Sequence, residues 1–201
     1  MDLFLVPDNP VNTVFVSTNG VAHYQTETPR CGINRTTVLT RPTDTDDGLV
    51  AEIAWRRYHW QHPTLVRTKL LANCRNSITG WRPLAEFLFK RSPRKTYKSR
   101  YFVADDGQEY RWKFEKNEQA VVLTRTSDNE EFARYERGLN KEGLYAGERK
   151  TRLHIRAECT IDYDLLLITF IATEQKRRDR AEFVLYQKGD QDPFGDGAGD
   201  S

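Results

Sequence analysis

Hydrophobic and polar positions separate most sharply near the C-terminus, between Asp162 and Glu182. From Leu165 to Ala172 the only polar residue is Thr169, whereas every residue from Glu174 to Arg180 is charged or carries an amide. Periodicity does not distinguish a buried strand from a buried helix in so short an apolar run. The residues around the run therefore have to decide between the two.

These flanking residues favour one helix over 162–182. Asp162 is well placed to cap its N-terminus, and Asp164 lies in the first turn, which favours acids. The basic residues come at the opposite end, where the helix dipole favours cations. Glu174 and Arg178 are four residues apart and predict an ion pair on one side of the helix.

A helix that is apolar on all sides has to be enclosed, either by a membrane or by protein. A bilayer span needs about 20 apolar residues, and this run is far shorter. The sequence therefore predicts that protein surrounds the helix. The residues expected in this core are Leu165, Leu166, Leu167, Ile168, Phe170 and Ile171.

The chain before the helix alternates apolar and polar residues in short runs that are separated by turn signals. Asn19-Gly20 and Asp105-Asp106-Gly107 mark two hairpins. A short helical turn is expected after Pro83. Strands are expected at 3–6, 12–17, 21–26, 35–41, 49–56, 99–104, 108–114, 120–126, 131–137 and 152–159, with two more between 64 and 78.

About twelve strands before one long helix predict a mainly β fold. Because a helix is about 10 Å across and an eight-stranded barrel is filled by its own side chains, a wider barrel is needed to enclose it. The predicted architecture is a closed antiparallel β-barrel of about twelve strands around the hydrophobic C-terminal helix. The alternative, a two-sheet sandwich with the helix on one face, would need a polar stripe along the apolar run.

The composition is that of a well-hydrated single domain, expected at 1–188: of 201 residues 30% are charged, and mean hydropathy is -0.73. Residues 189–201 are rich in Gly and Asp and predict a disordered acidic tail. The net charge of +2 gives no overall attraction to nucleic acid, so no such partner is expected. Met1–Pro7 lacks the basic start of a signal peptide, which favours a cytoplasmic location.

Five short segments, in order, cover nearly the whole chain: Asn9 to Thr13, Glu27 to Pro29, Ala51 to Trp55, Asp106 to Lys113, and the hydrophobic helix that runs into Lys176 to Arg180. In these segments the chain resembles an uncharacterised fungal family, a domain of unknown function. That family is related to the tubby C-terminal-like superfamily, with the LURP-one-related proteins and the phospholipid scramblases. The resemblance implies a twelve-stranded barrel around a central helix. Tubby-type domains bind phosphoinositides, but no set of lipid-binding residues carries over one by one.

The densest basic stretch runs from Lys90 to Arg100 and contains no acid. Clustered cations attract anionic headgroups by about 1 kcal/mol each near a charged surface. The simpler interpretation is a solvated loop before a strand. The candidate residues for anion or lipid binding are Lys90, Arg91, Arg94, Lys95, Lys98 and Arg100.

No catalytic, metal or cofactor site is predicted. His59 and His62 would point to opposite faces of a strand, and no Cys or carboxylate cluster adjoins them. Cys159 lies near the helix start, where a dipole lowers a thiol pKa, but it has no identifiable histidine partner.

The chain is therefore expected to be a non-catalytic intracellular binding domain, located in the cytoplasm or at the periphery of a membrane. Its first candidate ligand is an anionic membrane lipid. A protein-interaction or scaffold module, suggested by the acidic tail, is the second hypothesis, and an enzyme of unknown type is the third.

Overall fold

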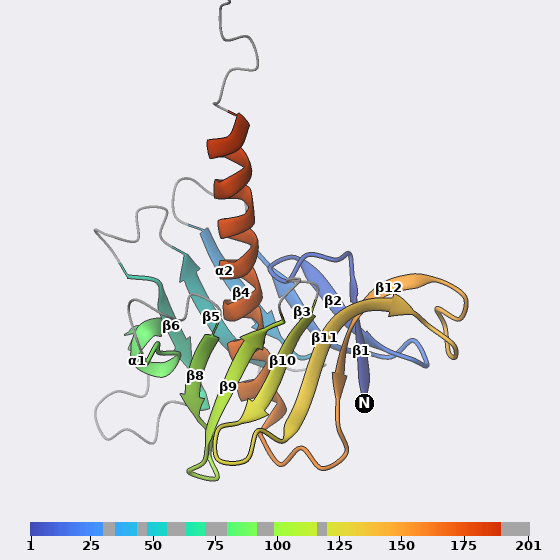
Figure 1. The fold of residues 1–201 in the computed structure, drawn as a ribbon, viewed down its shortest axis with the longest axis horizontal. Coiled ribbons are helices and arrows are strands. Elements are labelled where there is room, and N and C mark those ends of the chain that lie inside the picture. The colour runs from blue at the N-terminus through green and yellow to red at the C-terminus, as the bar shows by residue number, and fades with distance from the viewer. Residues whose placement is uncertain are drawn as a thin grey trace, which may run out of the picture.

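The structure is a computed structural model that describes residues 1–29, 35–43, 48–55, 63–70, 80–91, 99–115 and 120–189, with side chains up to residue 181. Figure 1 shows strands curved around one long helix, whose C-terminal half projects from one end of the sheet. The elements are β1 (Asp2–Val6), β2 (Thr13–Ser17), β3 (Ala22–Glu27), β4 (Arg35–Thr40), β5 (Leu49–Trp55), β6 (Leu65–Thr68), β7 (Arg82–Pro83), α1 (Leu84–Phe87), β8 (Ser99–Val103), β9 (Glu109–Phe114), β10 (Ala120–Arg125), β11 (Glu131–Leu139), β12 (Arg149–Ile155) and α2 (Tyr163–Gly189).

Within the described residues, twelve strands pair antiparallel in one sheet, in the order β7-β6-β5-β4-β3-β2-β1-β12-β11-β10-β9-β8. The chain passes from edge strand β7 through α1 to Phe89, which exchanges two backbone hydrogen bonds of 2.8 and 2.9 Å with Tyr101 on the other edge strand, β8. The mainly β prediction, with about twelve antiparallel strands and one C-terminal helix, is confirmed. Closure of this sheet into a barrel stays a prediction.

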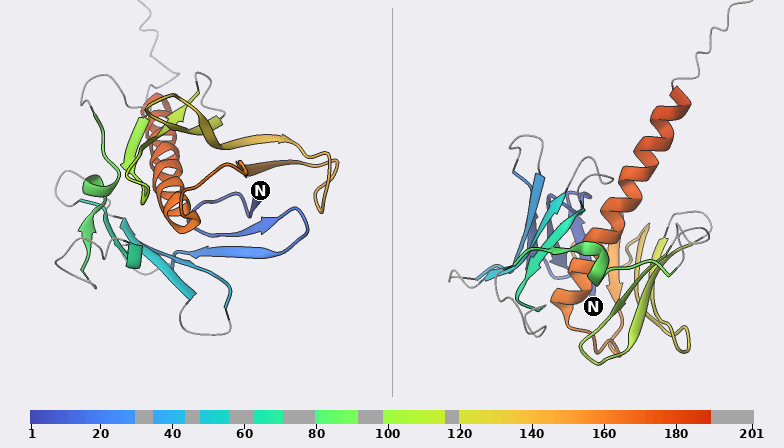
Figure 2. Two further views of the ribbon diagram at one scale, coloured as in Figure 1. Left: turned by 90° about the horizontal axis from the view of Figure 1, so that it is seen from below. Right: turned by 90° about the vertical axis from the view of Figure 1, so that its left-hand side faces the viewer.

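The apolar run of α2 is enclosed on all sides. Ten consecutive residues, from Leu165 to Glu174, are each at most 6% exposed. Because a helix turns by about 100° per residue, these residues face every direction around its axis. Figure 2 shows the sheet curving around this part of α2. No helix among the described residues is long and apolar enough to cross a membrane.

Phe170 lies in the centre of this core. Its ring packs against the rings of Phe15, Trp112 and Tyr135, with centroid distances of 6.5, 5.8 and 4.8 Å. These partners belong to β2, β9 and β11, so one side chain of α2 joins well-separated strands. Thr169 is satisfied because its hydroxyl accepts a hydrogen bond from Trp112 Nε1 (2.9 Å) and donates one to a carbonyl of α2 (2.9 Å).

The start of α2 is fixed by two acids. Asp162 Oδ1 accepts a hydrogen bond from the amide of Asp164 (2.7 Å), as expected of an N-terminal cap. Asp164 Oδ1 in turn accepts hydrogen bonds from the Tyr24 hydroxyl and from Arg41 Nε, both at 2.9 Å. The helix continues past the predicted end at residue 182 to Gly189, the last of the described residues.

Two strands differ from the sequence-based expectation. The last strand is Arg149–Ile155 and not 152–159, because its pairing with β11 starts at Leu139 and continues to Ala133. Of the two strands expected between 64 and 78, one is β6, and residues 71–79 lie outside the described residues. β7, at Arg82–Pro83, is a strand of two residues that was not expected. A strand this short that contains a proline shows no alternation of apolar and polar residues.

Candidate functional site

Helix α2 carries a buried acid where it leaves the sheet. The side chain of Glu174 is 0% exposed, and it accepts hydrogen bonds of 2.7 Å from Arg177 and from Arg178 Nε. The predicted Glu174–Arg178 ion pair is therefore present. Removing a carboxylate from water costs several kcal/mol, so the two guanidinium groups are what makes this burial tolerable.

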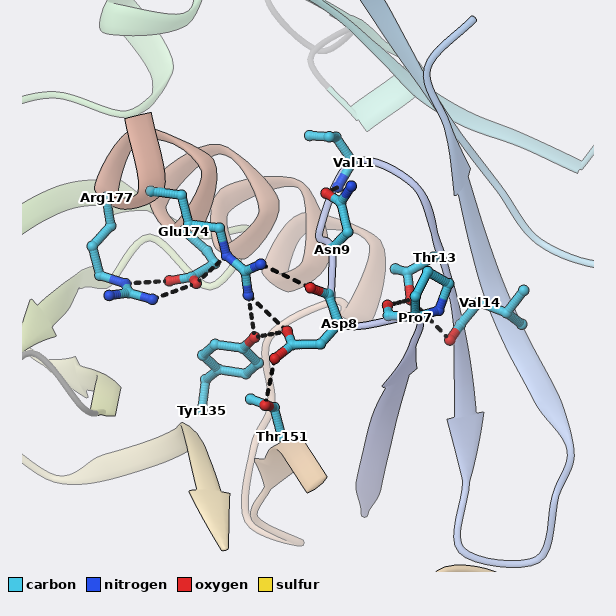
Figure 3. A network of polar contacts seen from close by, with 11 residues as sticks. Pro7, Asp8, Asn9, Val11, Thr13, Val14, Tyr135, Thr151, Glu174 and Arg177 are labelled. Atoms are coloured by element: carbon cyan, nitrogen blue, oxygen red, sulfur yellow. Dashed lines mark hydrogen bonds and ion pairs between the residues drawn. The ribbon is translucent and has the colours of Figure 1, made fainter. Parts of the chain in front are cut away.

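Arg178 connects this pair to the loop between β1 and β2. It donates hydrogen bonds to the carbonyl oxygen and to Oδ1 of Asp8 (2.8 and 2.7 Å). The hydroxyls of Tyr135 on β11 and Thr151 on β12 also donate to this carboxylate, at 2.9 and 2.7 Å. Figure 3 shows the side chains of Tyr135 and Thr151 pointing toward Asp8 beside α2. Four parts of the chain meet in this network.

The protonation states in the network are well defined. Burial favours a raised pKa for Asp8, but hydrogen bonds from Thr151, Arg178 and Tyr135 outweigh it and hold the pKa below its ordinary value. Burial raises the pKa of Tyr135, and the charges of Glu174 and Asp8 raise it further. The Asp8 carboxylate is thus ionised and the Tyr135 phenol neutral near neutral pH. Neither has the pKa of a general acid or base that works there.

A cleft of about 760 Å³ opens beside the network. We call it the arginine cleft. Arg137 and Arg149 come from the paired strands β11 and β12, and Arg177 and Arg178 come from α2. Its polar lining consists mainly of Arg137, Arg149, Arg177, Arg178, Asp8 and Thr151.

A second group of charges lies on another side of α2. Lys176 and Arg180 are about one helical turn apart, and about 200° around the axis separates Lys176 from Arg178. The positive charges of Arg100, Lys90 and Arg180 all act on Lys176. We call Lys90, Arg100, Lys176 and Arg180 the basic cluster.

Arg100 is the buried member of the basic cluster. It is only 5% exposed, and it pairs with Trp112 of β9, so both side chains lie on the inner face of the sheet. Its guanidinium donates a hydrogen bond to the Ser99 carbonyl (3.0 Å), and it forms no ion pair with a carboxylate of the described residues. Buried charges are ordinarily paired. Arg100 is therefore a cation without a counterion in this part of the chain.

The pKa values in the basic cluster reflect this crowding. Burial, together with the charges of Arg100, Lys90 and Arg180, lowers the pKa of Lys176 to about 8. Burial and the charge of Arg180 lower the pKa of Arg100 to about 10. Burial, followed by repulsion from Arg100 and Arg180, also lowers the pKa of Lys90. A bound anion would reverse the effect of the repulsion.

The structure places only part of the basic stretch that the sequence singled out. Lys90 and Arg100 are brought together in the basic cluster. Arg91 instead donates to Glu109 (2.5 Å), and its guanidinium lies 5.1 Å from the centre of the Tyr101 ring. Arg94, Lys95 and Lys98 lie outside the described residues.

Several residues of the two sites were not expected from the sequence. Lys176 and Arg180 were ascribed to the helix dipole, although their spacing of four residues marks one side of α2. Asp8 lies between two strands, and no local pattern indicates which distant side chains it contacts. The pattern around Arg137 and Arg149 is that of ordinary exposed strand residues, and nothing in it indicates a binding site.

The other candidate chemistry gives no site. Cys159 is partly buried, and burial raises the pKa of its thiol, which disfavours the reactive thiolate. His59 and His62 lie outside the described residues. In the described ranges, no three His, Cys, Asp or Glu side chains are grouped so that they could hold a metal ion.

Comparison with known proteins gives one match. Residues 8–179 match a family described as a family of unknown function (DUF6593). The chain belongs to this family. The DUF6593 segment includes both Asp8 and Arg178, so the whole polar network lies within it. No curated protein and no solved structure matches the chain. The resemblance is thus confirmed as far as a domain of unknown function, and its tubby-like and fungal parts stay predictions.

Proposed function

We propose that the chain is a non-catalytic binding domain that holds an anionic membrane lipid through the basic cluster. The observation that carries the proposal is Arg100, a cation 5% exposed that has no carboxylate partner among the described residues. Arg180 of α2 lies close enough to lower the pKa of both Lys176 and Arg100. A phosphate group supplies the counterion that such a site lacks. The proposed location is the cytoplasm, at a membrane surface.

We also infer a kinship with the tubby C-terminal-like superfamily, including the LURP-one-related proteins and the scramblases. The twelve antiparallel strands around an enclosed C-terminal helix support this kinship. Closure into a barrel is part of the same proposal, and the Phe89–Tyr101 pair between the sheet edges supports it. Phosphoinositide binding by tubby-type domains agrees with an anionic lipid as the ligand.

Co-sedimentation with vesicles tests the lipid proposal. The chain should sediment with phosphatidylcholine vesicles that contain a phosphoinositide, and not with phosphatidylcholine alone. Lys176→Met should weaken binding about fivefold, because one cation near an anionic surface contributes about 1 kcal/mol. Reversal of Arg94, Lys95 and Lys98 to Glu should weaken it further. Lys113→Met, at an exposed position of β9, is the matched control. Unchanged sedimentation of both test variants would remove the proposal.

The pH dependence of stability provides a test of the basic cluster that needs no ligand. Folding lowers the pKa of Lys176 from 10.5 to about 8, so between these values the unfolded chain holds a proton that the folded chain has lost. The free energy of unfolding should therefore rise as the pH increases from about 8. Below that pH Lys176 is charged in the folded chain, and the destabilisation caused by this charge is fully present. Urea denaturation across this range measures the rise.

Lys176→Met should remove this contribution and raise stability at neutral pH by about 1 kcal/mol or more. The difference between the two proteins isolates Lys176, because other groups, such as Cys159, titrate equally in both. Parallel stability curves for the two proteins would show that Lys176 is not in a crowded basic site.

A further inference from the structure

The arginine cleft extends the inner face of the sheet beyond the core. Every second residue of β11 lies on one face of the sheet, which here carries Tyr135, Arg137 and Leu139. On the paired strand β12, Thr151 lies opposite Arg137 and Arg149 lies opposite Leu139. The face is buried at Tyr135, which is 3% exposed, and becomes exposed at Arg137 and Arg149. The cleft therefore has a floor at the Asp8 network and a basic rim.

The charges of the arginine cleft do not balance. Its four guanidinium groups face two carboxylates, those of Asp8 and Glu174, which are bound by Arg177 and Arg178. Arg137 and Arg149 form no hydrogen bond and no ion pair with the described residues. Two positive charges thus remain at the rim of a cleft whose floor is already saturated with hydrogen bonds.

We propose that the arginine cleft binds a small organic phosphate, with Arg137 and Arg149 holding the phosphoryl group. A phosphate monoester carries a charge that matches the two rim guanidinium groups, whose forked donors fit its oxygens. The volume of about 760 Å³ lies in the range of small-molecule sites and exceeds what a bare ion fills. The Asp8 network fixes Arg178 and thereby shapes the floor. This site is separate from the basic cluster and does not depend on the proposed lipid function.

Calorimetric titration of the full chain with inorganic pyrophosphate tests this site. Pyrophosphate should bind with one-to-one stoichiometry, and the double variant Arg137→Gln/Arg149→Gln should bind about tenfold or more weakly, because each guanidinium contributes charge-assisted hydrogen bonds. The double variant should melt like the wild type, since neither exposed side chain forms a hydrogen bond or an ion pair within the part of the chain that the structure describes. Arg156→Gln, an exposed arginine after β12 and outside the cleft, is the matched control.

The variants also distinguish the arginine cleft from the basic cluster. They further show whether the phosphoryl group belongs to a soluble phosphate or to a lipid headgroup. Lys176→Met should leave pyrophosphate binding unchanged, and Arg137→Gln/Arg149→Gln should leave sedimentation with phosphoinositide vesicles unchanged. If the double variant lost vesicle binding as well as pyrophosphate binding, the cleft would take a lipid headgroup and the proposal of a soluble phosphate would be wrong. The absence of any pyrophosphate binding, or equal binding by the double variant, would overturn the site.

Discussion

Phe170→Asp should prevent the chain from folding. The wild-type ring is 0% exposed and packs against Phe15, Trp112 and Tyr135. Losing a buried phenylalanine costs about 3–5 kcal/mol, and the substitution also places a carboxylate in an apolar core, which adds a desolvation penalty. Together these approach the total stability of a domain, about 5–15 kcal/mol. We expect no cooperative thermal transition and no native near-ultraviolet circular dichroism.

Two further variants make this result specific. Ala181→Asp introduces the same charge at an exposed position of α2 and should change stability by about 0.5 kcal/mol or less. Phe170→Leu keeps the core apolar and should fold with reduced stability. A Phe170→Asp protein that stays soluble and melts cooperatively would contradict the enclosure of α2 by the sheet.

Glu174→Gln should lower the free energy of unfolding by about 3 kcal/mol, because removing one partner of a buried ion pair leaves the other charge uncompensated. Here the substitution leaves two guanidinium groups, those of Arg177 and Arg178, which bind the 0% exposed carboxylate at 2.7 Å. Arg178 keeps its bond to Asp8, so the helix end should loosen without complete unfolding. Urea denaturation followed by circular dichroism measures the loss.

A double-mutant cycle shows whether this loss comes from the ion pair. Arg178→Gln and the double variant Glu174→Gln/Arg178→Gln complete the cycle, and we expect a coupling of about 1 kcal/mol or more between the two sites. Glu158→Gln removes an exposed carboxylate from the segment before α2 and should be nearly neutral. Additive losses in the cycle, or a Glu174→Gln protein as stable as the wild type, would mean that the buried pair does not hold the end of α2.

The strongest local patterns predicted the fold well. The run from Leu165 to Ala172 has no polar stripe, and this absence alone required enclosure of a helix. Turn signals such as Asp105-Asp106-Gly107 located the hairpins, because Gly107 adopts a positive φ of 74° that glycine tolerates. Weak or short patterns failed: β7 has only two residues, and the start of β12 is set by its pairing with Leu139.

The candidate sites were much less accessible to sequence reasoning. Lys90 and Arg100 were found because they belong to a basic run, but their partners Lys176 and Arg180 are far along the chain. Arg100 was expected at the surface, and its burial follows only from its pairing with Trp112 on the inner face. Charges are compatible with a solvated face wherever they occur, so a charged residue by itself does not predict its partner.

The sequence by itself determined that α2 is a helix and that its apolar run is buried, because the capping and charged residues that indicate a helix and the apolar run without a polar stripe are neighbours in the chain. The tertiary structure alone decided that Glu174 is buried between Arg177 and Arg178 and that Arg178 reaches Asp8, near the other end of the chain. Apolar patterning is local and acts through area removed from water. An ion pair between distant parts of the chain, such as that of Arg178 with Asp8, depends on the position of two particular atoms, and that position is fixed only when distant strands have packed around the helix.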